Sequence, residues 1–288
     1  MSSPRPPREL PSPIRPRLLV GALVLSMLLL PMLASGAAVA HVATISGLRF
    51  THGHGGGGGS GSCGTNGVTS TQSTNWGGYA AETCLSNPAS NSVSDVKGSW
   101  VQPAVTCGNT ASYAAFWVGI DGYSSSTVEQ TGTDSDCSSG QPTYYAWYEF
   151  YPAYPVNLDK TKYTVSPGDS ISAEVLWTAG SSFTVSVSDS NPAHSWTFTT
   201  VGTVNNAARS SAEWIAEAPS SGHVLPLANF GTVQFTSCTA TIGGVNGGIQ
   251  NPTWAAAEIT MVGHSYAKAT PSGLTSSYQD FSVVWDHS

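Results

Sequence analysis

Charged side chains are scarce in this chain. Asp, Glu, Lys and Arg together make up 9% of its 288 residues, whereas an average globular protein has roughly 25%. The aromatic content of 10% argues against disorder, because disordered chains lack the aromatic residues that build a core. Only 10 residues are Lys or Arg, against 17 Asp and Glu. Without a basic stripe to neutralise phosphates, nucleic acid is excluded as a partner.

Motifs of metal and serine chemistry are also missing. The sequence contains no CxxC or HExxH spacing, so no zinc site is expected, and we expect no other metal or cofactor. It contains no G-x-S-x-G, and nothing places a serine beside His194, His223 or His264. The other four histidines lie in a flexible segment or at the end of the chain. A serine-type hydrolase is therefore not favoured.

The one long apolar run lies near the N-terminus. Four arginines within residues 1–17 precede Leu18–Leu30, and Ala38–Ala40 follows as an A-x-A end. This pattern predicts a secretory signal peptide over residues 1–40. An uncleaved membrane anchor is the alternative, but Pro31 makes the run short for a span. We therefore expect a secreted, extracellular protein with no membrane attachment after cleavage.

Cleavage after Ala40 would leave six basic and sixteen acidic residues, a formal net charge of −10. So few bases predict tolerance of acid, because protonating the carboxylates would leave only a modest positive charge. Residues 41–71 contain a Gly/His-rich tract and predict a linker or short propeptide. Residues 72–288 then form one domain, which we expect to be a monomer.

The five cysteines are an odd number for a secreted protein. They are Cys63, Cys84, Cys107, Cys137 and Cys238. Disulfides are expected outside the cell, and Cys63, in the linker, is the natural candidate for the residue left out. The remaining four cysteines allow three connectivities, and the sequence does not choose among them.

From Ser73 onward, short runs rich in Val, Thr, Trp, Tyr and Phe alternate with Gly, Ser, Asn and Pro. Regular spacing of this kind predicts an all-β sandwich or barrel. No long segment has a helical period. The expected strands include Trp76–Ala81, Val93–Val101, Tyr113–Ile120, Tyr144–Tyr151, Ser170–Trp177, Ser182–Ser188, Trp196–Thr200, Glu213–Glu217, Val233–Thr241, Ala256–Met261 and Phe281–Trp285.

The chain is organised around Ala115–Gly122, which is followed by a second strand at Thr127–Gly132. Side chains alternate along a strand, so Phe116, Val118 and Ile120 point one way. The opposite set includes Trp117 and Asp121, an unusual composition for a plain solvent-facing surface. We interpret this face as the floor of a groove.

Two further strands carry carboxylates beside aromatic or apolar neighbours. Trp147, Glu149 and Tyr151 share one face of the most aromatic strand, and Glu213 shares a face with Glu217. If these faces form one surface, carboxylates crowded in a partly apolar groove can serve as general acids or bases.

Together these segments resemble the glutamic peptidases, or eqolisins, a family of acid endopeptidases known from fungi. Seven sequence words carry the resemblance in order, over about Ser73–Thr241 and more weakly to Trp285. They are Asn75–Gly78, Trp100–Pro103, Trp117–Gly122, Gln130–Gly132, Ala146–Pro152, Gly168–Ile171 and Ala212–Glu217.

The resemblance implies a concanavalin A-like β-sandwich of two antiparallel sheets with a concave substrate groove. It also implies a Gln/Glu dyad, which falls on Gln130 and Glu217. Glu217 would activate a water that attacks a peptide bond of a protein or peptide substrate. The supporting and substrate-binding candidates are Trp117, Asp121, Asp134, Glu149, Tyr151 and Glu213.

Two departures from the family pattern affect the groove. The family commonly has Asp immediately before the Ala-Trp-Tyr-Glu word, where this chain has Tyr145. This change removes an acid from the groove. The residue before the catalytic Gln is usually apolar, and here it is Glu129. Glu129 should face away from Gln130, where it needs solvent or a partner. The cysteine positions also differ, so no disulfide pairing is carried over.

Two alternatives to a secreted acid endopeptidase remain. A glycoside hydrolase or lectin would also use an aromatic groove with carboxylates. It would have no special use for Gln130, because a glycosidase needs two carboxylates across the bond. A catalytically inactive binding module is the other alternative, and the presence of both Gln130 and Glu217 argues against it.

Overall fold

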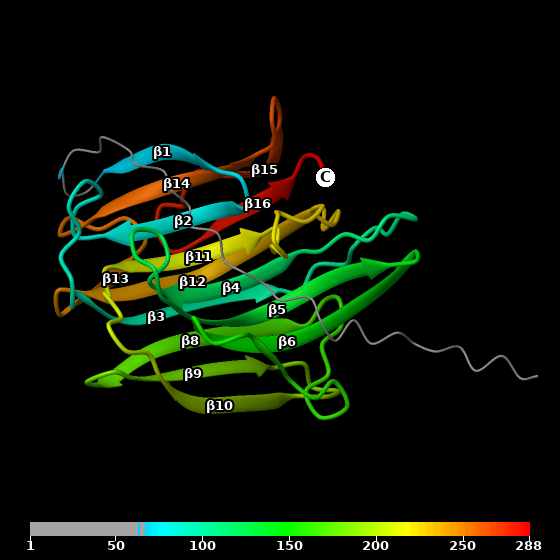
Figure 1. The fold of residues 1–288 in the computed structure, drawn as a ribbon, viewed down its shortest axis with the longest axis horizontal. Coiled ribbons are helices and arrows are strands. Elements are labelled where there is room, and N and C mark those ends of the chain that lie inside the picture. The colour runs from blue at the N-terminus through cyan, green and yellow to red at the C-terminus, as the bar shows by residue number, and fades with distance from the viewer. Residues whose placement is uncertain (1–62, 64–66) are drawn as a thin grey trace, which may run out of the picture. The chain divides into compact units, whose positions relative to one another are not determined.

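A computed structural model describes Cys63 and residues 67–288. The expected signal peptide and most of the expected linker lie outside the described residues. Among residues 67–288 every regular element is a strand, so the all-β prediction is confirmed (Figure 1). No helix in this part of the chain is long and apolar enough to cross a membrane.

Fourteen of the sixteen strands pair along one hydrogen-bonded path that folds into two layers, and β1 and β13 pair beside it. The first layer runs β10–β9–β8–β3–β12, and the second runs β14–β2–β11–β4–β5–β6–β7. The first-layer strands are β3 (Val93–Val101), β8 (Ser170–Ala179), β9 (Ser182–Asp189), β10 (Trp196–Thr203) and β12 (Thr232–Ile242). The second-layer strands are β2 (Trp76–Glu82), β4 (Ala115–Ile120), β5 (Val128–Ser138), β6 (Gln141–Tyr151), β7 (Val156–Asn157), β11 (Ser211–Glu217) and β14 (Ala255–Val262).

Two strands join the layers at one edge, so the sandwich is not built from two separate sheets. β15 (Ala267–Pro271) pairs with β14, and β16 (Phe281–Trp285) pairs with both β15 and β12. The short β13 (Val245–Gly248) pairs with β12. All these pairings are antiparallel, whereas β1 (Val68–Ser73) runs parallel to β14. β1 includes residues 68–71, which the sequence analysis assigned to the linker.

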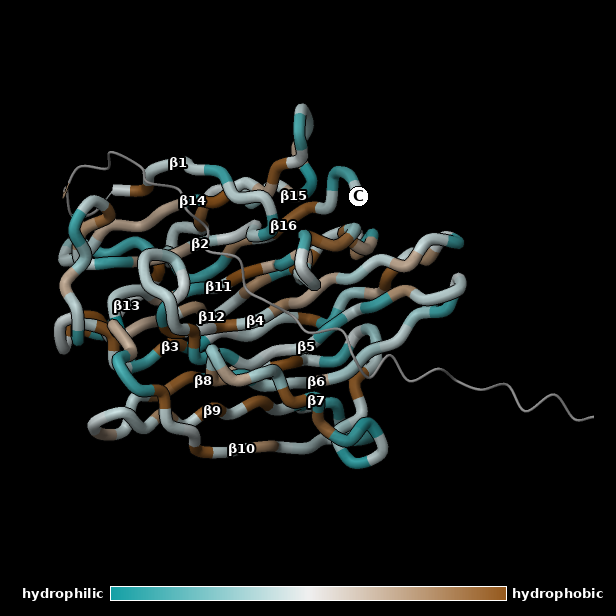
Figure 2. The backbone as a smooth tube through the Cα atoms, in the orientation of Figure 1, coloured by the Kyte–Doolittle hydropathy of each residue, from teal (hydrophilic) through white to brown (hydrophobic). Residues whose placement is uncertain are grey.

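The main core lies between the layers, where β3, β8 and β9 pack against β4, β5 and β11. Its large, fully buried members include Trp100, Phe116, Trp214 and Phe235. Gly98 on β3 makes the close approach possible, because a Cβ there would lie 2.9 Å from Cδ1 of Trp214. Hydrophobic residues accordingly recur between hydrophilic ones along the strands (Figure 2).

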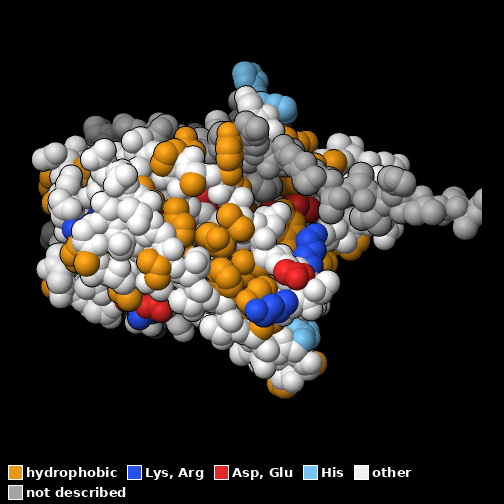
Figure 3. Space-filling model, turned by 60° about the horizontal axis from the view of Figure 1, so that its bottom comes forward, with side chains coloured by type: hydrophobic (Ala, Val, Ile, Leu, Met, Phe, Trp, Pro, Cys, Tyr) orange, Lys and Arg blue, Asp and Glu red, His pale blue; other side chains and the backbone are white. Residues whose placement is uncertain are grey.

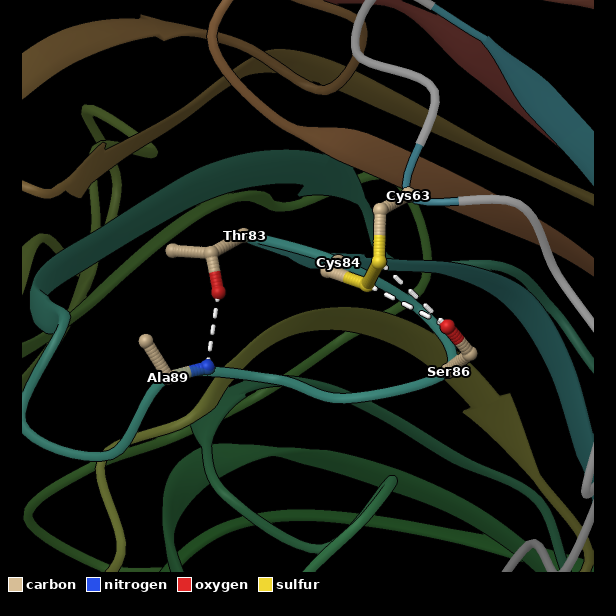
Figure 4. Close-up of a disulfide and its surroundings, with 5 residues drawn as sticks. All are labelled: Cys63, Thr83, Cys84, Ser86 and Ala89. Atoms are coloured by element: carbon tan, nitrogen blue, oxygen red, sulfur yellow. Dashed lines mark hydrogen bonds between the residues drawn. A yellow bond between two sulfur atoms is a disulfide. The ribbon is translucent and has the colours of Figure 1, made fainter.

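The disulfides correct one expectation. Cys63 is not the unpaired cysteine: it is bonded to Cys84, at the end of β2, and Ser86 Oγ lies within 3.4 Å of both sulfurs (Figure 4). The second bond joins Cys107 to Cys137 of β5. The free cysteine is Cys238, which is fully buried within β12. The spacing of the five cysteines along the chain does not indicate that Cys238 points into the core.

Candidate active site

The central strand β4 has two different faces. Phe116, Val118 and Ile120 belong to the core between the layers. Ala115 and Trp117 belong to a second buried cluster on the opposite side of the same layer. We call this second side of β2, β11, β4, β5 and β6 the site face. The alternation expected from the sequence is therefore confirmed for β4.

Strand register brings the candidate residues together on the site face. Gln130 pairs with Gly119 of β4 on one side and with Glu149 of β6 on the other. Across β4, Glu213 is also opposite Gly119, whereas Glu217 and Asp134 are both opposite Ala115. Side chains at paired positions point to the same side of a sheet. Glu149 of β6 and Glu213 and Glu217 of β11 thus share one surface with Asp134 of β5, whereas Asp121 lies beyond the end of β4.

Glu217 is fully buried, and each of its carboxylate oxygens accepts a hydrogen bond. Asn75 Nδ2 donates to Oε1 at 3.1 Å, and Trp117 Nε1 donates to Oε2 at 2.8 Å. Asn75 is itself oriented by Ser73, whose hydroxyl donates to Asn75 Oδ1 at 3.1 Å. Neutral donors to both oxygens orient a carboxylate without adding a charge beside it.

The Trp117 ring lies against its own strand and the next one. Gly132 of β5 is opposite Trp117, and a Cβ at Gly132 would lie 2.7 Å from Cβ of Trp117. A Cβ at Gly119 would lie 2.9 Å from Cζ3 of the same ring. The Trp76 ring meets Trp117 edge-on, with ring centroids 5.1 Å apart. The two glycines therefore leave the space that the indole needs to reach Glu217.

Gln130 is fully buried, and only one of the two polar atoms of its side-chain amide has a hydrogen-bond partner within the described residues. Nε2 donates to Glu149 Oε2 at 2.8 Å, while Oε1 has no hydrogen-bond partner there. Gln130 and Glu213 are both opposite Gly119, so they lie at the same position along the strands. Glu217 follows Glu213 by four residues on β11. Gln130 and Glu217 thus do not bond each other directly, so a bridging group would have to join them.

A third group of bonds surrounds Asp134. Trp147 Nε1 donates to Oδ1 of Asp134 at 2.7 Å, and the Tyr145 hydroxyl lies 2.8 Å from Oδ2. The same hydroxyl lies 2.8 Å from Oδ2 of Asp136. The sequence analysis did not single out Asp136. The acid that is missing at position 145 is therefore compensated by an aspartate two residues beyond Asp134 on β5.

Asp121 lies just beyond the end of β4, in a loop. Its backbone has a φ of 71°. Its carboxylate accepts from the backbone N–H groups of Arg209 and Ser210 at 2.7 and 2.9 Å, and Thr127 Oγ1 donates to it at 3.3 Å. Asp121 thus holds the loop between β10 and β11. Tyr151 ends β6 opposite Val128 and is half-buried.

Three glutamates are fully buried, and their carboxylate oxygens have no hydrogen-bond partner within 67–288. Glu82 and Glu213 lie on the site face. Burial raises the pKa of Glu82 to about 8 and raises that of Glu213 well above its usual range. Glu129 faces away from Gln130, as expected, but it enters the core, and burial raises its pKa strongly. Glu82 was not anticipated, because a single glutamate at a strand end is usually solvated.

One group of side chains in the described part of the chain has the composition of a metal site. Asp169, Asp189 and His194 bring three ligand-type atoms within 4.8 Å of one another. Their hydrogen bonds explain the cluster without an ion: His194 Nε2 lies 2.9 Å from Asp169 Oδ2, and Asn191 contacts both aspartates. The cluster ties the turn between β9 and β10 to the start of β8.

Comparisons with known proteins identify the family. The sequence model of the Peptidase A4 family matches residues 74–278. Aspergillopepsin-2 of Aspergillus niger is 35% identical over 202 residues, which is 62% of this chain and 68% of that protein. Scytalidopepsin B of Scytalidium lignicola is 32% identical over 190 residues, again 62% and 68% of the two chains.

Solved structures show the same fold. A scytalido-glutamic peptidase with a transition state analog inhibitor has a TM-score of 0.61 at 24% identity, and the match covers 75% of this chain and 100% of that one. The aspergilloglutamic peptidase of Aspergillus niger has a TM-score of 0.52 at 32% identity, with 60% and 99% covered. Both agree with the β-sandwich that the sequence analysis expected.

Proposed function

The chain belongs to the Peptidase A4 family and is a glutamic-type endopeptidase, and from this premise we propose that Gln130 and Glu217 are its catalytic dyad. We propose further that it is a secreted enzyme that works in acid on protein or peptide substrates. Family membership favours a peptidase over the carbohydrate-active alternative, and the presence of both Gln130 and Glu217 argues against an inactive module.

In this proposal Glu217 acts as the general base. Ionised, it takes a proton from a bound water as the water attacks the carbonyl carbon of the peptide bond. The protonated Glu217 then gives its proton to the leaving nitrogen. Asn75 and Trp117 support this role, since their two hydrogen bonds hold both carboxylate oxygens in place.

Gln130 supplies the neutral partner. An amide offers one acceptor and two N–H donors, and only one donor is used, toward Glu149. Oε1 is left to accept a hydrogen bond from the attacking water, and the second N–H is left to stabilise the oxyanion. The amide does not titrate, so it keeps both roles in acid. The water and substrate carbonyl would bridge the distance between Gln130 and Glu217.

The observation that carries the proposal is the shared site face. It presents Glu217, oriented by two donors, together with an unpartnered amide oxygen of Gln130. Trp117, Asp121, Asp134, Glu149, Tyr151 and Glu213 are proposed as supporting residues. The proposal also includes three assignments along the chain: residues 1–40 as signal peptide, 41–71 as linker or propeptide and 72–288 as the catalytic domain of a monomer.

The test is cleavage of a denatured protein substrate at about pH 3–4, near the usual carboxyl pKa. Glu217→Gln should abolish activity, and Gln130→Ala should reduce kcat by about 10²–10³-fold, the usual effect of losing an oxyanion donor. Both variants should keep the wild-type unfolding temperature within a few degrees.

Two matched substitutions serve as controls. Glu174→Gln and Gln234→Ala make related changes on the outer face of the first layer, and both should leave activity unchanged. A folded Glu217→Gln enzyme that still cleaves at the wild-type rate would remove Glu217 from the mechanism. A wild-type enzyme without activity after confirmed removal of residues 1–62, which keeps Cys63 and β1, would overturn the proposed function itself.

A further inference from the structure

The hydroxyl of Tyr145 has two carboxylate neighbours but only one hydrogen. Its oxygen lies 2.8 Å from Oδ2 of Asp134 and 2.8 Å from Oδ2 of Asp136. One contact uses the tyrosine hydrogen, so the other needs a hydrogen from a carboxyl group. At least one of the two aspartates is therefore protonated in this arrangement. We call Asp134, Tyr145 and Asp136 the acid trio.

Burial favours the same conclusion. Asp134 is 1% exposed and Asp136 is 8% exposed. Burial and the neighbouring Asp136 raise the pKa of Asp134 well above its usual range, while the bond from Trp147 opposes that rise. Burial raises the pKa of Asp136 to about 7, and Tyr145 and Lys160 act in the opposite direction.

The charged surroundings decide which aspartate keeps the proton. Lys160 acts on Asp136 and lies over the Tyr145 ring, 4.7 Å from its centroid. Asp134 instead faces Glu217 across Ala115, and the charge of Glu217 opposes its ionisation. Tyr113, beside Asp136, is the remaining titratable neighbour. A negative charge is therefore better tolerated on Asp136 and a proton on Asp134.

We propose that Tyr145 and Asp136 keep Asp134 protonated beside Glu217, and that the acid trio acts as a set of positioning residues that determine the upper pH limit of peptide hydrolysis. The Asp134 O–H donates to Tyr145 Oη, and the Tyr145 O–H donates to Asp136. Loss of the Asp134 proton would place a second negative charge near Glu217, on the face where the oxyanion develops, and oppose the reaction. This inference rests on the proposed role of Glu217.

Two substitutions in the full-length chain should both move the alkaline limb of the kcat/KM–pH profile to lower pH. Asp136→Asn removes the neighbouring charge and leaves the Tyr145 hydroxyl free to donate to ionised Asp134. The limb should then move to lower pH by about one unit. Tyr145→Phe removes the acceptor of the Asp134 proton, so the limb should again move to lower pH.

Two other substitutions serve as controls, because they remove a tyrosine hydroxyl and neutralise an aspartate outside the acid trio. Tyr148→Phe removes a hydroxyl on the other face of β6, and Asp286→Asn neutralises an exposed aspartate near the C-terminus. Neither should shift the profile. If Asp136→Asn and Tyr145→Phe lower activity equally at every pH, or do not move the limb to lower pH, the trio has only a structural role and the inference fails.

A second measurement separates this inference from the proposed function. In a Gln130→Ala chain, which keeps Glu217 beside Asp134, the carboxyl carbon of ¹³C-labelled Asp134 can be followed by NMR without any need for activity. It should report a protonated carboxyl at pH 5, about one unit above the ordinary Asp pKa. An ionised Asp134 at pH 5 would overturn the inference, even with an intact dyad. An active Glu217→Gln enzyme would overturn the dyad instead.

Discussion

Trp117 connects more of the candidate site than any other single side chain described above. Its indole N–H holds Glu217, its ring contacts Trp76, and the glycines at positions 119 and 132 leave space for it. The sequence analysis proposed Trp117 as part of a groove floor, on the basis of its alternation with the core residues of β4. Its bond to Glu217 could not be anticipated, because the partner is 100 residues away.

Trp117→Phe keeps an aromatic ring but removes the N–H donor. A hydrogen bond to a charged group contributes about 1.5–3 kcal/mol, so kcat/KM should fall by roughly 10- to 150-fold. Stability should change far less, because the ring still fills most of the same space. Steady-state kinetics and thermal unfolding together test this expectation. Trp177→Phe removes an exposed indole N–H from β8 and should leave kcat/KM unchanged; equal losses in the two variants would contradict the assigned role of Trp117.

At the scale of strands, the sequence predicted which side chains share a face of the sheet better than it predicted which side chains contact one another. Alternation along β4, β6 and β11 correctly separated the site residues from the core, because burial imposes a period of two. Periodicity carries no information on register between strands, so the levels of Gln130 and Glu217 along the sheet came only from the structure. The same limit explains why the bond from Tyr145 to Asp136 was missed.

Short pairing segments were the other omission at this scale. β7 and β13 have two and four residues, and the parallel β1 precedes the first recognisable sequence word. Such segments are too short to show an alternating pattern of their own. Their existence depends on a neighbouring edge, such as that of β14 for β1.

The Cys107–Cys137 disulfide ties the segment before β4 to the end of β5. Its sequence separation is 30 residues, and closing a loop of that size stabilises a fold by about 3–4 kcal/mol in the chain-entropy model. The double variant Cys107→Ser/Cys137→Ser should therefore lose stability of that order in urea unfolding. Because Asp136 directly precedes Cys137, the double variant should also lose activity once the temperature exceeds its own, lower melting temperature. Cys238→Ala keeps both disulfides and is the comparison; if the double variant is no less stable than that protein, the bond contributes nothing to the folded state.

At the scale of the whole molecule, charged side chains are scarce on the surface, and several of the acidic side chains are buried. On the face drawn in Figure 3 few side chains are charged, which agrees with a total of 9%. Several of the carboxyl groups that do exist are inside: Glu82, Glu129 and Glu213 are fully buried, with no hydrogen-bond partner for their carboxylate oxygens in the described structure. Few surface bases limit repulsion in acid, and buried acids are tolerated while they are protonated.

The buried glutamates predict how stability depends on pH. Burial raises the pKa of Glu82 from its ordinary value to about 8 and raises those of Glu129 and Glu213 in the same direction. A group whose pKa is higher in the folded state binds its proton more tightly there. Its contribution is complete below the unfolded-state pKa and is lost as pH rises toward the folded-state value. Each such glutamate should therefore lower the free energy of unfolding by about 1.4 kcal/mol per pH unit across that window.

Urea unfolding of the wild type should consequently show greater stability at about pH 4 than at about pH 8, values that lie at the two ends of the window for Glu82. Glu82→Gln keeps the size of the side chain but does not titrate, so it should reduce the difference between the two conditions. Glu174→Gln, at a half-exposed glutamate paired with Lys97, should leave the difference as it is. If the wild type were as stable at about pH 8 as at about pH 4, the buried glutamates would have to be ionised and paired in the folded protein. Such a dependence would agree with the acid tolerance that the scarcity of basic residues predicts.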